Sequence, residues 1–296
     1  MFAVTRSVVP RIAFALMLAA AIAPAQDLTK LQVFKPGEET LTRYIRIRSR
    51  IRSFQSDGHL VGGKVKVTHF SGDLGGGRIQ FNGNLDWTNK TGQQTARVTL
   101  QNVDSRQFLS AFNLDFDARI VTRVNADVSV KWQGISMPDL RRSMNGSMSM
   151  RTGRGRVDKS TVFDALAEAT GIQDLRSVDF ESCAGDGEVR NGVLYFENAR
   201  INGDFVRLLA AGKVDVPSDS IEIEVHLAIL PELAMRSARA DVRTVGALLA
   251  QAKSLQDQDG FVQLPVPVYL TGTFTKPHAS VAGITFEVPE GNKEKR

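Results

Sequence analysis

Residues 221–230 read Ile-Glu-Ile-Glu-Val-His-Leu-Ala-Ile-Leu. Every second side chain from Ile221 to Ile229 is aliphatic, and Glu222, Glu224 and His226 stand between them. Successive side chains of a β-strand point to opposite sides of its sheet. The stretch therefore predicts a strand with one apolar face and one polar face.

The same alternation returns along most of the chain. Residues 44–54 place Ile45, Ile47 and Ile51 opposite a row of arginines that includes Arg46 and Arg48. Further strands are predicted at 64–70, 78–87, 96–103, 124–132, 193–201, 208–216 and 266–274. This pattern predicts a mainly β fold, built as an antiparallel sheet of amphipathic strands.

Each one-sided strand needs a cover for its apolar face. A second sheet or the helices would supply one, giving a sandwich; a curved sheet with an open face would need an apolar ligand instead. From the residues alone, the packed core is the simpler interpretation and both remain open.

Three helical stretches and several tight turns interrupt the strands. A helix is predicted from Ser105, as its cap, to Phe112, and a second at 162–170, started by Ser160 or Thr161 and ended by Gly171. The longest is predicted at about 232–256. Gly75-Gly76-Gly77 and Asn191-Gly192 predict turns between strands.

Composition and motifs give no support for an enzyme or a metal centre. The formal net charge is +5, Cys183 is the single cysteine, and the four histidines lack the spacing of metal ligands. Neither a nucleophile elbow nor a phosphate-binding loop is present, so no catalytic residue, metal or cofactor is predicted. A loose basic cluster lacks the interleaved aromatic residues of a nucleic-acid site. The plain interpretation of this cluster is a solvated face, and the sharper one is contact with anionic lipid head groups, through Arg141, Arg142, Arg154 and Arg156.

The first 25 residues have the layout of a secretory signal peptide. Arg6 and Arg11 precede an apolar run that ends in Ala23-Pro24-Ala25. An uncleaved membrane anchor is the alternative. The predicted organisation is a signal peptide or anchor at 1–25, a linker at 26–42, one β domain at 43–288 and a polar tail at 289–296. We expect an exported, periplasmic protein, associated with the inner membrane if residues 1–25 are retained.

A series of short segments in a fixed order resembles a known family. They are Phe70–Ile79 (FSGDLGGGRI), Val103–Leu109, Leu140–Met150, Gly153–Val157, Gly192–Phe196, Leu209–Val216 and Leu264–Pro277 (LPVPVYLTGTFTKP). Taken together they are similar to the C-terminal domain of the AsmA-like proteins, relatives of TamB, over about residues 45–285. The resemblance implies a curved sheet whose apolar groove takes phospholipid acyl chains, with no active site.

For this chain the resemblance implies an envelope protein that binds phospholipids or helps to transfer them between membranes, in outer-membrane biogenesis. Family members are commonly much longer, which favours a lipid-binding module with a longer envelope partner or self-association. A structural or protein-interaction domain in the periplasm is the alternative. The predicted groove lining comprises Ile45, Ile47, Ile51, Val65, Val67, Ile79, Phe81, Leu85, Ile221, Ile223, Val225, Leu227 and Ile229.

Overall fold

The computed structural model describes residues 52–61, 64–86, 91–112, 119–134, 139, 142–215, 218, 220–273, 276–281 and 284–286. The predicted signal peptide, linker and tail lie outside this part of the chain, and so do residues 43–51 of the predicted domain. The described strands are β1 (Arg52–Val61), β2 (Lys64–Leu74), β3 (Gly77–Asp86), β4 (Gln93–Asp104), β5 (Arg119–Val121), β6 (Arg123–Gln133), β7 (Asn145–Thr152), β8 (Gly155–Asp158), β9 (Ser177–Arg190), β10 (Val193–Gly203), β11 (Val206–Asp215), β12 (Ser220–Ile229), β13 (Val262–Gln263), β14 (Val268–Thr273), β15 (Lys276–Val281) and β16 (Ile284–Phe286).

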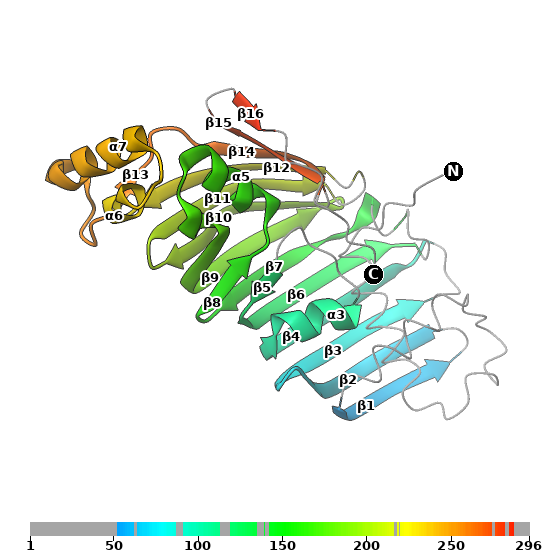
Figure 1. Cartoon of the computed structure of the whole chain (residues 1–296). Coiled ribbons are helices and arrows are strands. Elements are labelled where there is room, and N and C mark those ends of the chain that lie inside the picture. The colour runs from blue at the N-terminus through cyan, green and yellow to red at the C-terminus, as the bar shows by residue number, and fades with distance from the viewer. Residues whose placement is uncertain are drawn as a thin grey trace, which may run out of the picture.

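All of these strands belong to one antiparallel sheet. Its order is β1-β2-β3-β4-β6-β7-β9-β10-β11-β12-β14-β15-β16, so the path follows the chain, and β5, β8 and β13 pair beside it. Figure 1 shows the strands succeeding one another from β1 to β16 as an elongated, twisted array. The predicted open antiparallel sheet is confirmed, and no second sheet is present in the described residues, so a second sheet is not the cover of the apolar face there.

The register carries one apolar row straight across the sheet. Residues that face each other in an antiparallel pair place their side chains on the same side. From β2 to β16 the directly paired residues of this row are Phe70, Phe81, Val98, Val128, Met148, Gly187, Phe196, Gly212, Ile223, Leu270, Ala279 and Phe286. We call the side that carries this row the apolar face.

The neighbouring row points to the other side and is polar in all but one position. Its paired residues are Asn82, Arg97, Ser129, Ser147, Glu188, Tyr195, Lys213, Glu222, Thr271 and His278. We call this side the polar face. The alternation read from single strands is therefore in phase across the whole sheet. Bulges in β2, β4 and β10 each add one residue to the strand, and the apolar and polar side chains stay on their own faces on both sides of the bulge.

Tight turns connect several consecutive strands as predicted. Asn191 and Gly192 both have positive φ angles, 51° and 81°, between the paired ends of β9 and β10. Gly75 and Gly76, at 60° and 70°, do the same between β2 and β3. Two successive left-handed residues match the twist of the flanking strands, which is why these sequences form hairpins.

The helices partly follow the prediction. Helix α5 (Thr161–Thr170) has Ser160 as its N-cap and Gly171, with φ 70°, as its C-cap, as expected. Helix α3 (Ser105–Phe112) is found, but its cap is Asp104, whose Oδ1 accepts from the backbone N–H of Arg106 at 2.9 Å. Ser105 is not the cap because its hydroxyl donates to the Ile120 carbonyl at 2.7 Å.

The long helix predicted at about 232–256 is in fact two helices and a short 3-10 turn. They are α6 (Pro231–Met235), α7 (Ala240–Gln251) and η3 (Lys253–Leu255). Gly246 in the middle of α7 is buried against α6, so the two helices form a closely packed pair. This pair projects beyond the strand ends at one extremity of the sheet (Figure 1).

One end of the apolar face is covered by short helices. Buried residues of α5, of α6 and of the 3-10 turn η2 (Gln173–Arg176) pack on β11, β12, β14 and β15. The cluster comprises Ala167, Ile172, Leu175, Val206, Leu227, Leu233, Val268 and Ala279. This is the helical cover that the sequence left open as one of its alternatives.

Candidate functional site

The apolar face is fully buried over its first strands. Val67, Ile79, Phe81 and Val98 on β2, β3 and β4 keep 4%, 0%, 2% and 6% of their surface exposed. Side chains with so little exposure act as packed core and present no surface to a ligand.

Farther along, the same face stays buried in one row, at Val130, Val189 and Val214, and is half-buried in the rows beside it. Its half-buried side chains lie on β6, β7, β9, β10, β11 and β12, although they continue the same paired rows. They include Val128, Met148, Met150, Cys183, Leu194, Phe196, Ala199, Ile201, Leu208, Ala210, Ile223 and Val225. We call this set the half-buried stretch. Leu208 and Val225 of this set pack against the helix-covered cluster, and the other side chains are the part of the apolar face that stays partly exposed.

Small residues form the centre of the half-buried stretch. Gly185 of β9 is paired with Met150 of β7, and a Cβ placed on Gly185 would meet its nearest neighbour, Ala199 of β10, only at 3.4 Å. Ala199 is in turn paired with Ala210 of β11. Larger side chains stand on both sides, with Met150 on β7 and Val225 on β12 opposite Ala210. The sheet surface is thus lower at β9–β11 than at its flanks.

Cys183 lies on this same stretch, paired with Thr152 and with Ile201. Burial raises the pKa of its thiol, because a low-dielectric surrounding disfavours the thiolate. The residue is a free cysteine and has no neighbouring base that would activate it. Its thiol can serve as a chemical reporter of what covers the apolar face.

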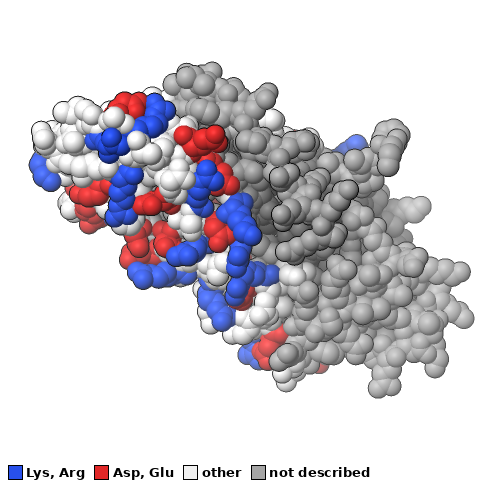
Figure 2. All heavy atoms as spheres, viewed as in Figure 1, with Lys and Arg blue, Asp and Glu red and all other residues white. Residues whose placement is uncertain are grey.

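The polar face is lined by cross-strand ion pairs. Arg97 pairs with Asp127 at 2.8 Å, Arg151 with Asp186 at 3.0 Å, and Lys213 with Glu222 at 2.9 Å. On the opposite side, which carries α5 and faces the viewer in Figure 2, basic and acidic side chains are also interspersed over the coloured part, with neither sign gathered into a patch. Exposed pairs of this kind contribute about 0–1 kcal/mol each and indicate a solvated surface.

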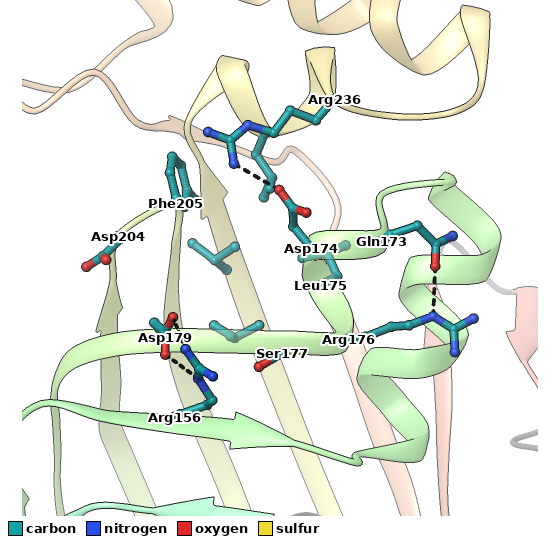
Figure 3. Close-up of a pocket in the computed structure, with 13 residues that line it drawn as sticks. Arg156, Gln173, Asp174, Leu175, Arg176, Ser177, Asp179, Asp204, Phe205 and Arg236 are labelled. Atoms are coloured by element: carbon teal, nitrogen blue, oxygen red, sulfur yellow. Dashed lines mark hydrogen bonds and ion pairs between the residues drawn. The ribbon is translucent and has the colours of Figure 1, made fainter.

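A cavity of about 510 Å³ opens at one end of the strands, beside the covered part of the apolar face (Figure 3). Its walls come from η2, the start of β9, the β10–β11 turn and α6; Arg156 of β8 and Arg236 after α6 complete them. The cavity forms because the pairing of β9 with β10 ends at Phe180, while residues 177–179 continue only along β8. Its apolar lining, Leu175, Val178, Val206 and Leu233, is buried.

Two ion pairs stand on opposite sides of this cavity in Figure 3. Arg236 pairs with Asp174 at 2.9 Å, and its guanidinium lies over the ring of Phe205 at 4.4 Å from the centroid. Arg156 donates two hydrogen bonds to Asp179, at 2.6 and 2.9 Å. These hydrogen bonds hold the pKa of Asp179 below its usual range and raise the pKa of Arg156.

No protein-family model, curated protein or solved structure matches this chain. Within the described residues, no helix is both long and apolar enough to cross a bilayer, and no cluster of three metal-ligating side chains occurs.

The predicted lining residues that the structure describes share the apolar face, but they differ in accessibility. Ile223, Val225 and Ile229 belong to its half-buried part. Val67, Ile79, Phe81, Ile221 and Leu227 are buried. Val65 and Leu85 are directly paired between β2 and β3, and Ile45, Ile47 and Ile51 lie outside the described residues.

The predicted head-group arginines do not form a single cluster. Arg154 and Arg156 are exposed at β8 and pair with Glu181 and Asp179, and of the two only Arg156 lines the cavity. Arg142 is exposed before β7, and Arg141 lies outside the described residues.

Sequence reasoning missed the residues at the centre of the half-buried stretch, notably those of β7 and β9. β9 carries Cys183, Gly185 and Gly187 where the other strands carry aliphatic residues. In β7, Met148 and Met150 alternate with serines, and this is the one sequence signal that indicates this region.

Proposed function

We propose that the protein is a non-enzymatic cell-envelope protein of AsmA-like type that binds phospholipids or helps to transfer them between membranes. The observation that carries the proposal is the half-buried stretch of the apolar face. It continues the same paired rows as the buried core of β2–β4, yet its side chains keep contact with the surroundings.

An acyl chain is the ligand that suits such a surface. It carries no polar group that would need a partner, and every methylene removed from water contributes about 0.8 kcal/mol. The low surface at Gly185, Ala199 and Ala210 leaves room for a chain between the larger side chains of β7 and β12. Ten methylenes would contribute roughly 8 kcal/mol before the cost of ordering the lipid.

Consecutive alanines on β11 give a matched test. Ala210 is on the apolar face opposite Val225, and Ala211 is on the polar face opposite Glu224; both are half-buried. We expect Ala210→Lys to remove most of the phospholipid that mass spectrometry detects in extracts of the purified protein, and Ala211→Lys to retain it. Equal lipid content in the two variants, or wild-type protein free of lipid, would contradict the proposal.

The native cysteine gives a second readout without any substitution. Lipid seated on the half-buried stretch should slow the reaction of Cys183 with a maleimide, because the thiol lies among the half-buried side chains. The control is the double variant Cys183→Ser with Ser147→Cys, whose thiol is on the exposed polar face. Lipid should leave its reaction rate unchanged, and equal protection at both positions would count against binding on the apolar face.

A structural or protein-interaction role is the second candidate, favoured by the tip of the molecule. Val245 and Leu248 of α7 are 52% and 61% exposed, and Leu255 of η3 is 59% exposed. If this role dominates, Val245→Ser with Leu248→Ser should abolish cross-linking to an envelope partner and leave the bound lipid unchanged. Cross-linking that the double variant does not alter would remove the support for this candidate.

A further inference from the structure

We propose that the cavity between β9 and the β10–β11 turn binds a zwitterionic phospholipid head group, one that carries a phosphate and an ammonium. This inference deepens the proposed function and rests on it. The cavity would bind the head group of the lipid, and the half-buried stretch would bind its acyl chain.

The charges around the cavity are balanced. Arg156, Arg176 and Arg236 line it together with Asp174, Asp179 and Asp204. The guanidinium of Arg176 turns away toward Gln173 at 2.9 Å and Asp164 at 3.6 Å, as Figure 3 shows for Gln173. Arg156 and Arg236 are each already paired with an aspartate, and Arg176 turns away. A purely anionic head group would therefore meet three carboxylates and no unpaired guanidinium that faces the cavity.

Arg236 has donors left for a phosphate. A guanidinium carries five N–H donors, and among the described residues Arg236 spends one hydrogen bond, from Nη1 to Asp174 at 2.9 Å. The ring of Phe205 holds the group from one side at 4.4 Å. A phosphate accepts from the remaining N–H groups without breaking the existing pair.

Asp204 supplies the complementary charge. It is exposed, lines the cavity beside Phe205 in the chain, and makes no ion pair within the described residues. An ammonium near Asp204 gains an ionic partner that no other described side chain already occupies. One charge of each sign is thus available on the two sides of Phe205.

The cavity and the place proposed for the acyl chain share strand β11. Val206 in its wall is on the apolar face of β11, followed on the same face by Leu208 and Ala210 of the half-buried stretch. Alternate residues of a strand advance by about 6.6 Å, so Ala210 is roughly 13 Å from Val206 along the strand. A head group in the cavity and a chain along β11 belong to one amphiphile.

Binding of short-chain, water-soluble phosphatidylethanolamine and phosphatidylglycerol, measured by calorimetry on the full chain, tests this inference. We expect wild-type protein to favour the ethanolamine lipid. Asp204→Asn should weaken that lipid about fivefold and leave the glycerol lipid unchanged, and Asp204→Lys should reverse the preference. Asp204 has no ion-pair partner among the described residues, so neither variant removes a contact that holds the fold.

Arg236→Gln should weaken both lipids about fivefold, and Arg236→Lys should restore part of the loss. Arg154→Gln is the matched control, because Arg154 is an exposed arginine with one ion pair, to Glu181, and is not among the residues that line the cavity; this variant should bind both lipids as the wild type does.

Three outcomes overturn the head-group inference: equal effects of Arg236→Gln and Arg154→Gln, a wild-type preference for the glycerol lipid, or no response to Asp204→Lys. The proposed function survives these outcomes if Ala210→Lys still abolishes the binding of both lipids. If the wild type binds neither lipid, the head-group inference and the proposed function both fail.

Discussion

Asp104 holds the first turn of α3 with a single carboxylate. It accepts from the N–H of Arg106 at 2.9 Å and from that of Gln107 at 3.3 Å. We expect Asp104→Ala to lower the free energy of unfolding by about 1 kcal/mol, and Asp104→Asn to retain most of it, because asparagine is an equally good cap. Urea unfolding at pH 7 measures both. Equal losses in the two variants would show that the cap is not what Asp104 contributes.

The same carboxylate makes this contribution depend on pH. The hydrogen bond from Arg106 holds the pKa of Asp104 below its usual range, while burial acts in the opposite direction. A pKa lowered by folding stabilises the fold fully above the ordinary value of about 3.9, and the contribution is lost as the pH falls through the lowered pKa. At acid pH the wild type should therefore lose unfolding free energy relative to Asp104→Asn, as measured by urea titrations. A constant difference would contradict this.

At this scale the sequence predicts which residue types cap a helix but not which one is used. Asp104 and Ser105 are adjacent and both are good caps. The choice depends on Ile120 and Thr122, whose backbone groups bond to the Ser105 hydroxyl from a strand 15 or more residues away. That contact exists only once the sheet has formed.

Among the elements, α7 depends on the absence of one side chain. A Cβ on Gly246 would lie 2.9 Å from the Ala234 Cβ and 3.0 Å from the Pro231 carbonyl oxygen of α6. We expect Gly246→Ala to destabilise the protein by about 1 kcal/mol net. Overpacking costs about 1–3 kcal/mol and exceeds the gain of about 1 kcal/mol in helix propensity.

Hydrogen exchange of the α7 amides and thermal unfolding measure this effect. The control is Ala247→Gly on the exposed side of α7, which should lose only the propensity of about 1 kcal/mol without separating the helices. A stabilised Gly246→Ala variant would mean that α6 and α7 are not in tight contact.

Strands with β-branched alternation, such as β6 and β12, could be placed from the sequence within a few residues. β9 could not, although it is 14 residues long, because Gly185 and Gly187 stand where an alternation needs large apolar residues. Those glycines are compatible with a strand only because β7 and β10 pair on either side. The residues next to these glycines in the sequence do not indicate that pairing.

For the molecule as a whole, position along the apolar face decides what a charge does there. Val67 is 4% exposed, whereas Ile223 is half-buried, although both point to the same side of the sheet. We expect Val67→Lys to cost about 3 kcal/mol or more in unfolding free energy, because the charge is buried without a partner. Ile223→Lys should cost less than half of that, remain folded by circular dichroism and lose bound lipid. Equal destabilisation would indicate that the whole face is closed core.

The sequence predicted the two faces of the sheet but not where the apolar one is open. Alternation assigns Ile79 and Ile223 to the same face with equal strength. Their different burial depends on what lies above each residue: even on β12, which α5, η2 and α6 partly cover, Leu227 is buried and Ile223 is half-buried. Such coverage involves residues far apart in the chain and leaves no periodic signal.

The strand order has a consequence for how such a molecule changes in length. Nearly every strand on the main path is hydrogen-bonded to the strands before and after it on that path, and the segments inserted between them leave those partners adjacent. Each hairpin is thus a modular unit, and its loss or duplication would remove or add a defined width of the apolar face. Copying or deleting such units would change the length of the sheet and leave the pairing of the remaining strands as it is.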